Sequence, residues 1–184
     1  TQLVNKGLIY REKGRGTFIT PHLLGRHLQR LEGFTEEMRA RGLSPSSTIL
    51  THELIPAPSV VQGKLGLAPS DRVLHIKRLQ RVEGSPIALH DAYITYMDLQ
   101  RSELEALGSL YRLLEMRGVW LKDAEERLEA ITASGEIGIY LEVDDCSPLL
   151  KVSRLTWDRS GMPVEWLEAV YRADLYNYTV YLNR

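Results

Sequence analysis

An internal repeat occupies most of the chain. Segments beginning at Leu67 and Leu141 share one order of features: an apolar run, Arg-Leu, a turn containing Gly, a Pro, a second apolar run and a Tyr. The equivalent residues are Arg78 and Arg154, Pro86 and Pro163, and, after one inserted residue in the second copy, Tyr93 and Tyr171. Proline is tolerated where a return strand begins, and turn residues separate the two runs. Each copy therefore predicts a β-hairpin, with turns at residues 83–85 and 159–161.

The match continues upstream of both hairpins. A strand at residues 48–55 and a helix at 59–65 correspond to a strand at 121–131 and a helix at 135–141. A β-α-β-β unit used twice predicts an α+β fold, one antiparallel sheet with helices on one side. A pseudo-two-fold arrangement leaves a cleft where the equivalent hairpins and helix starts meet, and such a cleft is the default ligand site.

Four further helices follow from apolar spacing and helix-end residues. Residues 22–31 predict a connecting helix, and 101–107 and 109–116 predict a pair between the repeats. Residues 36–41 predict a helix that Thr35 caps and Gly42 closes.

Composition limits the protein class. Hydrophobic residues make up 43% and charged residues 26%, and the net charge is −1, values of an ordinary globular domain. No run approaches the roughly 20 apolar residues of a membrane helix, and no leader pattern precedes residue 20, so a cytoplasmic protein without membrane contact is expected. The single Cys146 excludes an intrachain disulfide framework and is expected to be a small core residue.

The N-terminal segment concentrates positive charge. Gly14 and Gly16 lie in a basic stretch between two β-prone runs, residues 8–10 and 17–19, which predicts a hairpin with a basic tip. Residues 3–7 are typical of a helix ending on a glycine. A helix end followed by a basic ribbon is how a winged helix-turn-helix ends, its cations lying beside phosphates. A solvated surface hairpin is the alternative.

The words LVNKGLIYREKGRGTFI resemble the wing of the GntR superfamily of bacterial transcription regulators. The resemblance implies that residues 1–20 end a winged helix-turn-helix, that 21–32 form a connecting helix or linker, and that 33–184 form an effector domain. It implies DNA contacts for the wing residues Arg11, Lys13, Arg15 and Gly16.

The remaining chain resembles the UTRA effector domain of the HutC subfamily, which shares the fold of chorismate lyase. The matching words are GFTEEMRARGLSPSS, LHIKRLQRVEGSPIALHDAYI, SLYRLLE, AEERLEAI and SPLLKVSRLTWDRSGMPVEWLEAVYRADLY. The resemblance implies a homodimeric regulator, commonly a repressor, whose operator DNA binding is controlled allosterically by a small metabolite. It implies no cofactor and no metal. The expected effectors are sugar phosphates, amino acids, organic acids or phosphonates.

The resemblance also implies the effector-contacting positions. Phe34 and Thr35 match the start of the first UTRA helix, where an anionic group is held. Arg78 matches the arginine that pairs with that anion. The further positions are Gln80, where relatives often have a second arginine, His90, where the family usually has Glu, and Ser109, Glu165 and Tyr171. Plain helix capping is the alternative for Thr35 and Ser109, and a surface strand arginine is the alternative for Arg78.

Two other functions are alternatives to a ligand-responsive regulator. The resemblance to the chorismate lyase fold makes an enzyme one alternative. The five histidines, however, do not have the spacing of metal ligands, and the sequence contains no nucleophile-turn or phosphate-loop motif. Glu125, Glu126 and Glu129 are interpreted as a solvated acidic edge. The other alternative is an interaction module without a ligand. If Phe34, Thr35, Arg78, Glu165 and Tyr171 converge on one pocket, a sensor is favoured over such a module.

Overall fold

The structure, a computed structural model, describes residues 9–12, 16–19, 24–27 and 31–179. The N-terminal hairpin is confirmed: β1 (Ile9–Glu12) pairs antiparallel with β2 (Gly16–Ile19). The basic tip at residues 13–15 and the helix end predicted at residues 3–7 lie outside the described residues. No helix in the described part of the chain is long and apolar enough to cross a membrane.

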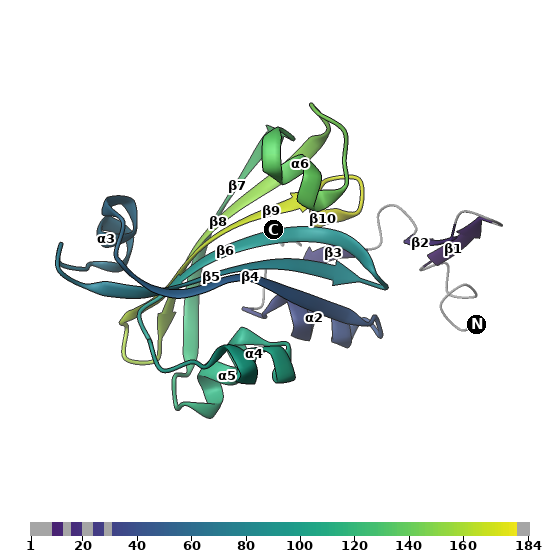
Figure 1. Cartoon of the computed structure of the whole chain (residues 1–184). Coiled ribbons are helices and arrows are strands. Elements are labelled where there is room, and N and C mark those ends of the chain that lie inside the picture. Colours follow the sequence, from purple (N-terminus) through teal and green to yellow (C-terminus); the bar gives the residue numbers. More distant parts are fainter. Residues whose placement is uncertain (1–8, 13–15, 20–23, 28–30, 180–184) are drawn as a thin grey trace, which may run out of the picture.

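The centre of the molecule is one antiparallel sheet built from the two repeats (Figure 1). The first repeat supplies β4 (Pro45–Pro56), β5 (Arg72–Val82) and β6 (Ser85–Ile94); the second supplies β7 (Leu121–Thr132), β8 (Pro148–Asp158) and β9 (Pro163–Arg172). Their order is β4-β5-β6-β9-β8-β7, so the two copies meet where β6 pairs antiparallel with β9. The predicted α+β fold and the repeat are confirmed.

The strand register corrects one residue pairing of the repeat. Leu74 lies opposite Ile94 in the first hairpin, and the equivalent Leu150 lies opposite Tyr171 in the second. The inserted residue therefore lies in the turn, and Ile94, not Tyr93, is equivalent to Tyr171. Because a shift of one residue moves a side chain to the other face of a sheet, Tyr93 lies opposite the predicted cleft. It stacks there on His75 with ring centroids 4.8 Å apart.

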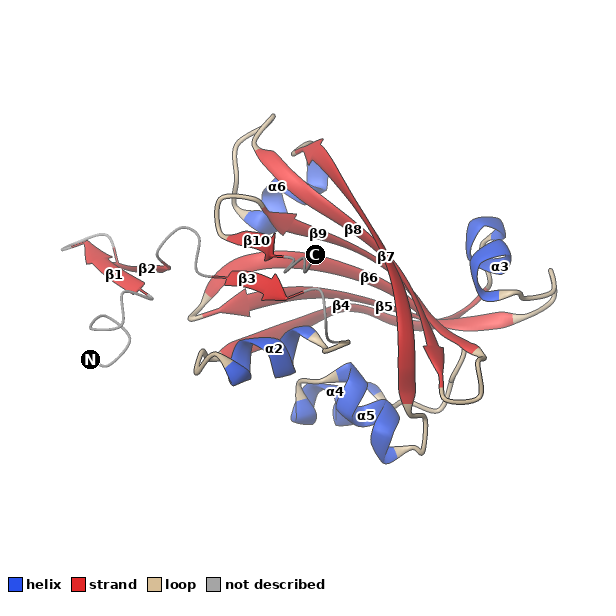
Figure 2. Ribbon diagram, turned by 180° about the vertical axis from the view of Figure 1, so that it is seen from behind, coloured by secondary structure: helices blue, strands red, loops and turns tan. Residues whose placement is uncertain are grey.

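Helices cover both faces of the sheet, whereas one covered face was predicted (Figures 1 and 2). Three helices join the largest apolar cluster on one face: α2 (Phe34–Ala40), α4 (Arg101–Leu107) and α5 (Leu110–Met116). On the other face lie α3 (Ser59–Leu65) and α6 (Gly135–Leu141). The strands explain the difference, because successive residues such as Val73 and Leu74, which point to opposite faces, are both apolar and buried, so each face needs a cover.

The helix ends around the predicted cleft differ in one detail from the sequence prediction. Gly33, not Thr35, is the N-cap of α2, and the Thr35 hydroxyl instead donates a hydrogen bond of 2.6 Å to the carbonyl of Gly108. Gly42, with φ of 74°, follows the end of α2 as predicted. Ser109 caps α5 by accepting a 3.1 Å hydrogen bond from the Arg112 N–H.

The connecting helix predicted at residues 22–31 is wrong where the structure describes this segment. There the chain forms β3 (Leu24–His27), which pairs parallel with β10 (Tyr176–Thr179). Pairing with a strand at the far end of the chain overrides the local leucine spacing, and single-sequence periodicity carries no information about such a partner. The domain boundaries proposed above remain predictions.

Cys146 is exposed and does not belong to the core, contrary to the prediction. It lies in the turn between α6 and β8 with φ of 64°, and its N–H donates to the Ala133 carbonyl at 3.0 Å. The turn geometry, rather than packing, defines its position.

The core predicts a clear stability difference between two isoleucines. Ile76 in β5 is fully buried, whereas Ile139 in α6 is 77% exposed. Ile76→Ala is expected to lower the free energy of unfolding by about 2–5 kcal/mol because it leaves a cavity. Ile139→Ala should change it by less than about 0.5 kcal/mol. Urea unfolding followed by circular dichroism measures both, and equal losses would contradict this assignment of the core.

Candidate ligand-binding site

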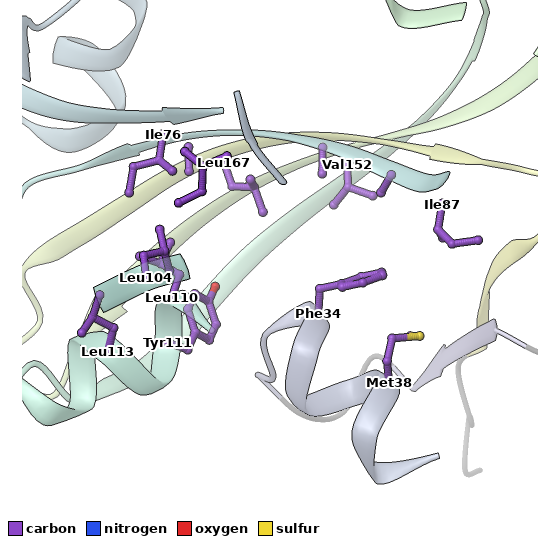
Figure 3. Packing of buried hydrophobic residues seen from close by; sticks show 14 of the residues in the cluster. Phe34, Met38, Ile76, Ile87, Leu104, Leu110, Tyr111, Leu113, Val152 and Leu167 are labelled. Carbon is purple, nitrogen blue, oxygen red and sulfur yellow. The ribbon is translucent and has the colours of Figure 1, made fainter. Parts of the chain in front are cut away.

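A small polar cavity lies between the inner face of the sheet and the starts of α2 and α5. Its volume is about 20 Å³, room for roughly one water molecule. Seven of the eight predicted effector residues line it: Phe34, Thr35, Arg78, Gln80, His90, Glu165 and Tyr171. Figure 3 shows Phe34 of α2 and Tyr111 of α5 both directed toward the sheet. The eighth, Ser109, does not line the cavity. Its hydroxyl donates a hydrogen bond to Glu36, which does line it.

Arg78 projects from β5 into this cavity as a buried charge without a counterion. Its side chain is 6% exposed, and among the described residues it has neither an ion pair nor a hydrogen bond; its Nε is buried and unpartnered. Burial lowers the pKa of the guanidinium, and the nearby Glu165 and Tyr111 oppose that shift. A buried charge is normally paired, so the surface-strand alternative for Arg78 does not hold.

The second repeat shows what a paired arginine looks like at the equivalent position. Arg154 of β8 lies opposite Glu126 on the neighbouring strand β7 and forms a buried ion pair with it. Arg78 lies opposite Ile49 on β4, and Ile49 supplies no charge. The two copies therefore place equivalent arginines beside the same cavity, and one of them lacks a counterion from its own sheet.

A hydrogen-bonded chain of buried groups forms the second half of the cavity wall. Arg154 donates from Nη1 to the Tyr111 hydroxyl at 2.9 Å, and that hydroxyl donates to Glu165 Oε2 at 2.7 Å. Thr156 also donates to Glu165 Oε2, at 3.2 Å. Because every link is satisfied, this chain holds the Glu165 carboxylate in one place at the cavity.

Two more groups at the cavity have unmet hydrogen-bonding capacity. Both amide atoms of Gln80, a residue 1% exposed, are buried without a partner. Glu36 uses Oε1 to accept from Ser109, while its Oε2 is buried and unpartnered. Buried polar atoms are usually satisfied. These atoms, together with Arg78, make the cavity the candidate site for a polar ligand.

Aromatic residues continue from the cavity toward β10. His90 contacts the Phe34 ring edge-on, with centroids 5.7 Å apart, and its Nε2 lies 3.0 Å from the Tyr171 hydroxyl. Tyr171 stacks on Tyr176, with centroids 4.2 Å apart. The Tyr176 hydroxyl donates to Glu37 of α2. Tyr171, which lines the cavity, therefore connects it to β10, the strand that pairs with β3.

Sequence reasoning missed polar residues that line the cavity, among them Glu36, Tyr111 and Arg154, and it also missed Glu126, which pairs with Arg154. The interpretation of Glu126 as a solvated edge residue is wrong, because its side chain is 11% exposed and pairs with Arg154. The role of Arg154 could have been predicted from the repeat, since Arg154 is equivalent to Arg78. Tyr111 and Glu36 carry no such sign, because only the packing of α5 against α2 brings them to the cavity.

The remaining predicted residues and groups can be placed only in part. Of the predicted wing residues, Arg11 lies in β1 and Gly16 in β2, while Lys13 and Arg15 lie outside the described residues. Within the described part of the chain, no three His, Cys, Asp or Glu side chains gather into a metal site.

The fold and the cavity define a class of protein once known proteins are compared. The family model of the UTRA domain matches residues 40–177. The chain therefore belongs to the UTRA-domain family of GntR-type transcription regulators, and it is a regulator rather than an enzyme.

Relatives and solved structures agree with this assignment. The chain is 30% identical to the HTH-type transcriptional repressor NagR of Bacillus subtilis, over all of this chain and 76% of that protein. The ligand-binding domain of a GntR-family transcriptional regulator from Bordetella bronchiseptica superimposes with a TM-score of 0.71 at 30% identity, over 76% of this chain and 91% of that one. PhnF of Mycobacterium smegmatis has the same fold, with a TM-score of 0.79 at 20% identity over 99% and 81% of the chains.

The buried ion pair predicts a charge-specific stability loss. Glu126→Gln keeps the shape of the side chain but leaves Arg154 without its counterion, so the free energy of unfolding should fall by roughly 3–5 kcal/mol. Glu125→Gln, at the exposed neighbour on the same strand, should change it by less than about 0.5 kcal/mol. Chemical denaturation of both variants gives the comparison, and similar values for the two would argue against a structural role of the pair.

Proposed function

We propose that this protein is a ligand-responsive repressor in which a small anionic metabolite binds the cavity and controls operator DNA binding. One observation carries the proposal: Arg78 is a buried guanidinium that the protein leaves without a counterion. Guanidinium groups bind carboxylates and phosphates in forked geometry, and such charge-assisted hydrogen bonds contribute about 1.5–3 kcal/mol each. An anionic ligand satisfies Arg78 in the way that Glu126 satisfies Arg154.

The other cavity residues complete the proposed site. Gln80 offers a donor and an acceptor to a neutral polar group, and Glu165 offers a carboxylate held by Tyr111 and Thr156. Tyr171, His90 and Phe34 form the aromatic part of the wall. The sugar phosphates, amino acids, organic acids and phosphonates named above all combine an anion with neutral or donor groups, and they remain the proposed effector classes.

The aromatic contacts suggest how ligand binding reaches the DNA-binding end. A ligand that moves Phe34 or His90 acts on Tyr171, which stacks on Tyr176 at the start of β10. β10 pairs with β3, which lies in the linker predicted between the wing and the effector domain. In a homodimer, a changed linker alters the separation of two DNA-reading heads, which must match half-sites roughly 34–36 Å apart or multiples of that distance.

Control of this kind requires a difference in affinity. The effector shifts the equilibrium between two arrangements of the dimer only as far as it binds one better than the other. The wing residues Arg11, Lys13, Arg15 and Gly16 would contact operator DNA in one of these arrangements. A repressor in the cytoplasm, where both DNA and metabolites are accessible, fits the named function of NagR.

The small volume of the cavity favours one rival function, an interaction module that binds no ligand. A space of about 20 Å³ holds no metabolite unless α2 or α5 moves. In an interaction module, the buried guanidinium of Arg78 would stay unpaired and would destabilise the fold permanently. In a ligand site, the same destabilisation is relieved when an anion binds. A measurement of ligand binding distinguishes a ligand-responsive regulator from an interaction module.

Loss of Arg78 is expected to abolish effector binding. Thermal unfolding of the wild-type chain against sugar phosphates, amino acids, organic acids and phosphonates should identify a ligand that adds about 2.7 kcal/mol of stability at 100 times its dissociation constant. Arg78→Met should remove that gain. The matched control is Lys77→Met, which removes a positive charge from the adjacent position on the opposite face of β5 and should retain it. A gain that survives Arg78→Met would contradict the proposed site.

A further inference from the structure

A second and larger pocket lies at the end of the sheet where α3 ends (Figure 2). Its volume is about 280 Å³, whereas the polar cavity beside Arg78 has about 20 Å³. The end of α3, the segments that follow β6 and α5, and the turn between β8 and β9 form its wall. Most of the side chains that line it are apolar: Leu65, Leu67, Tyr96, Val119, Met162 and Val164.

The polar groups in the wall of this second pocket already have partners. The Thr95 N–H donates a hydrogen bond of 2.9 Å to the Val164 carbonyl. Asp158 is the one charged side chain among the described residues that line the pocket, and its Oδ1 accepts from the N–H groups of Ser160 and Met162 at 2.8 and 2.9 Å. The buried side-chain atoms that lack a partner in the described part of the chain all lie elsewhere. The wall therefore leaves no polar group for a ligand to satisfy.

We propose that this pocket binds a small neutral apolar molecule of about one or two aromatic rings. An apolar cavity of about 150 Å³ stays empty of water and binds benzene, because its wall offers water no hydrogen bonds. A space of about 280 Å³ with a mostly apolar wall holds a somewhat larger molecule of the same kind. The inference is independent of the proposed function, because the two pockets share no described lining residue.

Charge at the wall selects against anions. The hydrogen bonds from Ser160 and from the backbone N–H groups of Met162 and Ser160 lower the pKa of Asp158, so its carboxylate is ionised at neutral pH. An anionic ligand would lose its hydration against apolar side chains and would lie near this negative charge. A neutral ring compound is therefore expected to bind at least tenfold more tightly than its carboxylate analogue. The metabolites proposed for the polar cavity are excluded from this pocket for the same reason.

The four methionines of the chain report on binding without any added label group at the pocket. Met162 lines the pocket, whereas Met116 is exposed outside it and Met38 is fully buried in the core beside α2. In the wild-type chain with ¹³C-labelled methionine methyl groups, titration with indole should shift the NMR signal of Met162 saturably. The expected dissociation constant is about 1 mM or lower. The Met38 and Met116 signals should keep their positions, and Met162→Leu identifies the signal of Met162.

A larger side chain in the wall should weaken this binding. Val119→Phe fills part of the space and is expected to raise the dissociation constant of indole at least tenfold. Val60→Phe makes the same change at a residue of α3 that is 67% exposed and does not line the pocket, and it should leave the constant unchanged. Leu67→Phe narrows the pocket from another segment and repeats the test if Val119→Phe does not fold, which circular dichroism shows.

Each result of the titration supports or overturns the assignment. The absence of a saturable Met162 shift overturns it, as does a shift that both Val119→Phe and Leu67→Phe leave unchanged. Equal affinity for indole and indole-3-carboxylate overturns the neutral ligand class. If the Met162 signal moves with protein concentration alone, a second copy of the chain covers the pocket, and the assignment to a small molecule is wrong.

Discussion

The pairing of β6 with β9 is the contact on which the rest of the molecule depends. Residues 88–94 of the first repeat lie antiparallel to residues 165–171 of the second, and this ladder turns two half-sheets into one. A strand left without this partner would expose backbone groups and a buried apolar row on both faces. The same ladder places His90 and Glu165 within one cavity although they come from different copies. The site is therefore a consequence of the junction and belongs to neither copy alone.

Function in this arrangement depends on where the two copies stop being equivalent. The bulges and register of the two hairpins match, so Arg78 and Arg154 occupy equivalent positions. Their neighbours on the edge strands differ, Ile49 in one copy and Glu126 in the other. That single difference converts one arginine into part of a buried ion pair and leaves the other as an uncompensated charge. A symmetric protein with two ion pairs would have a more satisfied interior and no reason to bind an anion.

Much of the fold could be predicted from the sequence because the same order of strands, helix and turns occurs twice in the chain, and each copy supports the interpretation of the other. The strands, α3, α6 and both hairpins follow from it, and resemblance to known regulators located seven of the lining residues. The failures share a physical cause, since β3 and Tyr111 each depend on a partner distant in sequence. The predicted equivalence of Tyr93 and Tyr171 is wrong for a different reason. An insertion in a turn shifts the alignment by one residue, and in a strand a shift of one residue moves the side chain to the other face. The burial of Glu126 was likewise invisible, since an acidic edge strand and one half of a buried pair have the same composition.

The small volume of the cavity limits how any ligand can enter. The sheet forms one wall of the cavity, and α2 and α5, which form the other, are joined by the hydrogen bond from Ser109 to Glu36. The Thr35 hydroxyl also binds the Gly108 carbonyl at 2.6 Å, so α2 is bound to the loop before α5 at a second point. Movement of α2 displaces Phe34 from His90 and Glu37 from Tyr176 at the start of β10. Because β10 pairs with β3, a movement of α2 that admitted the proposed ligand would also disturb the contacts of the strand that pairs with the predicted linker.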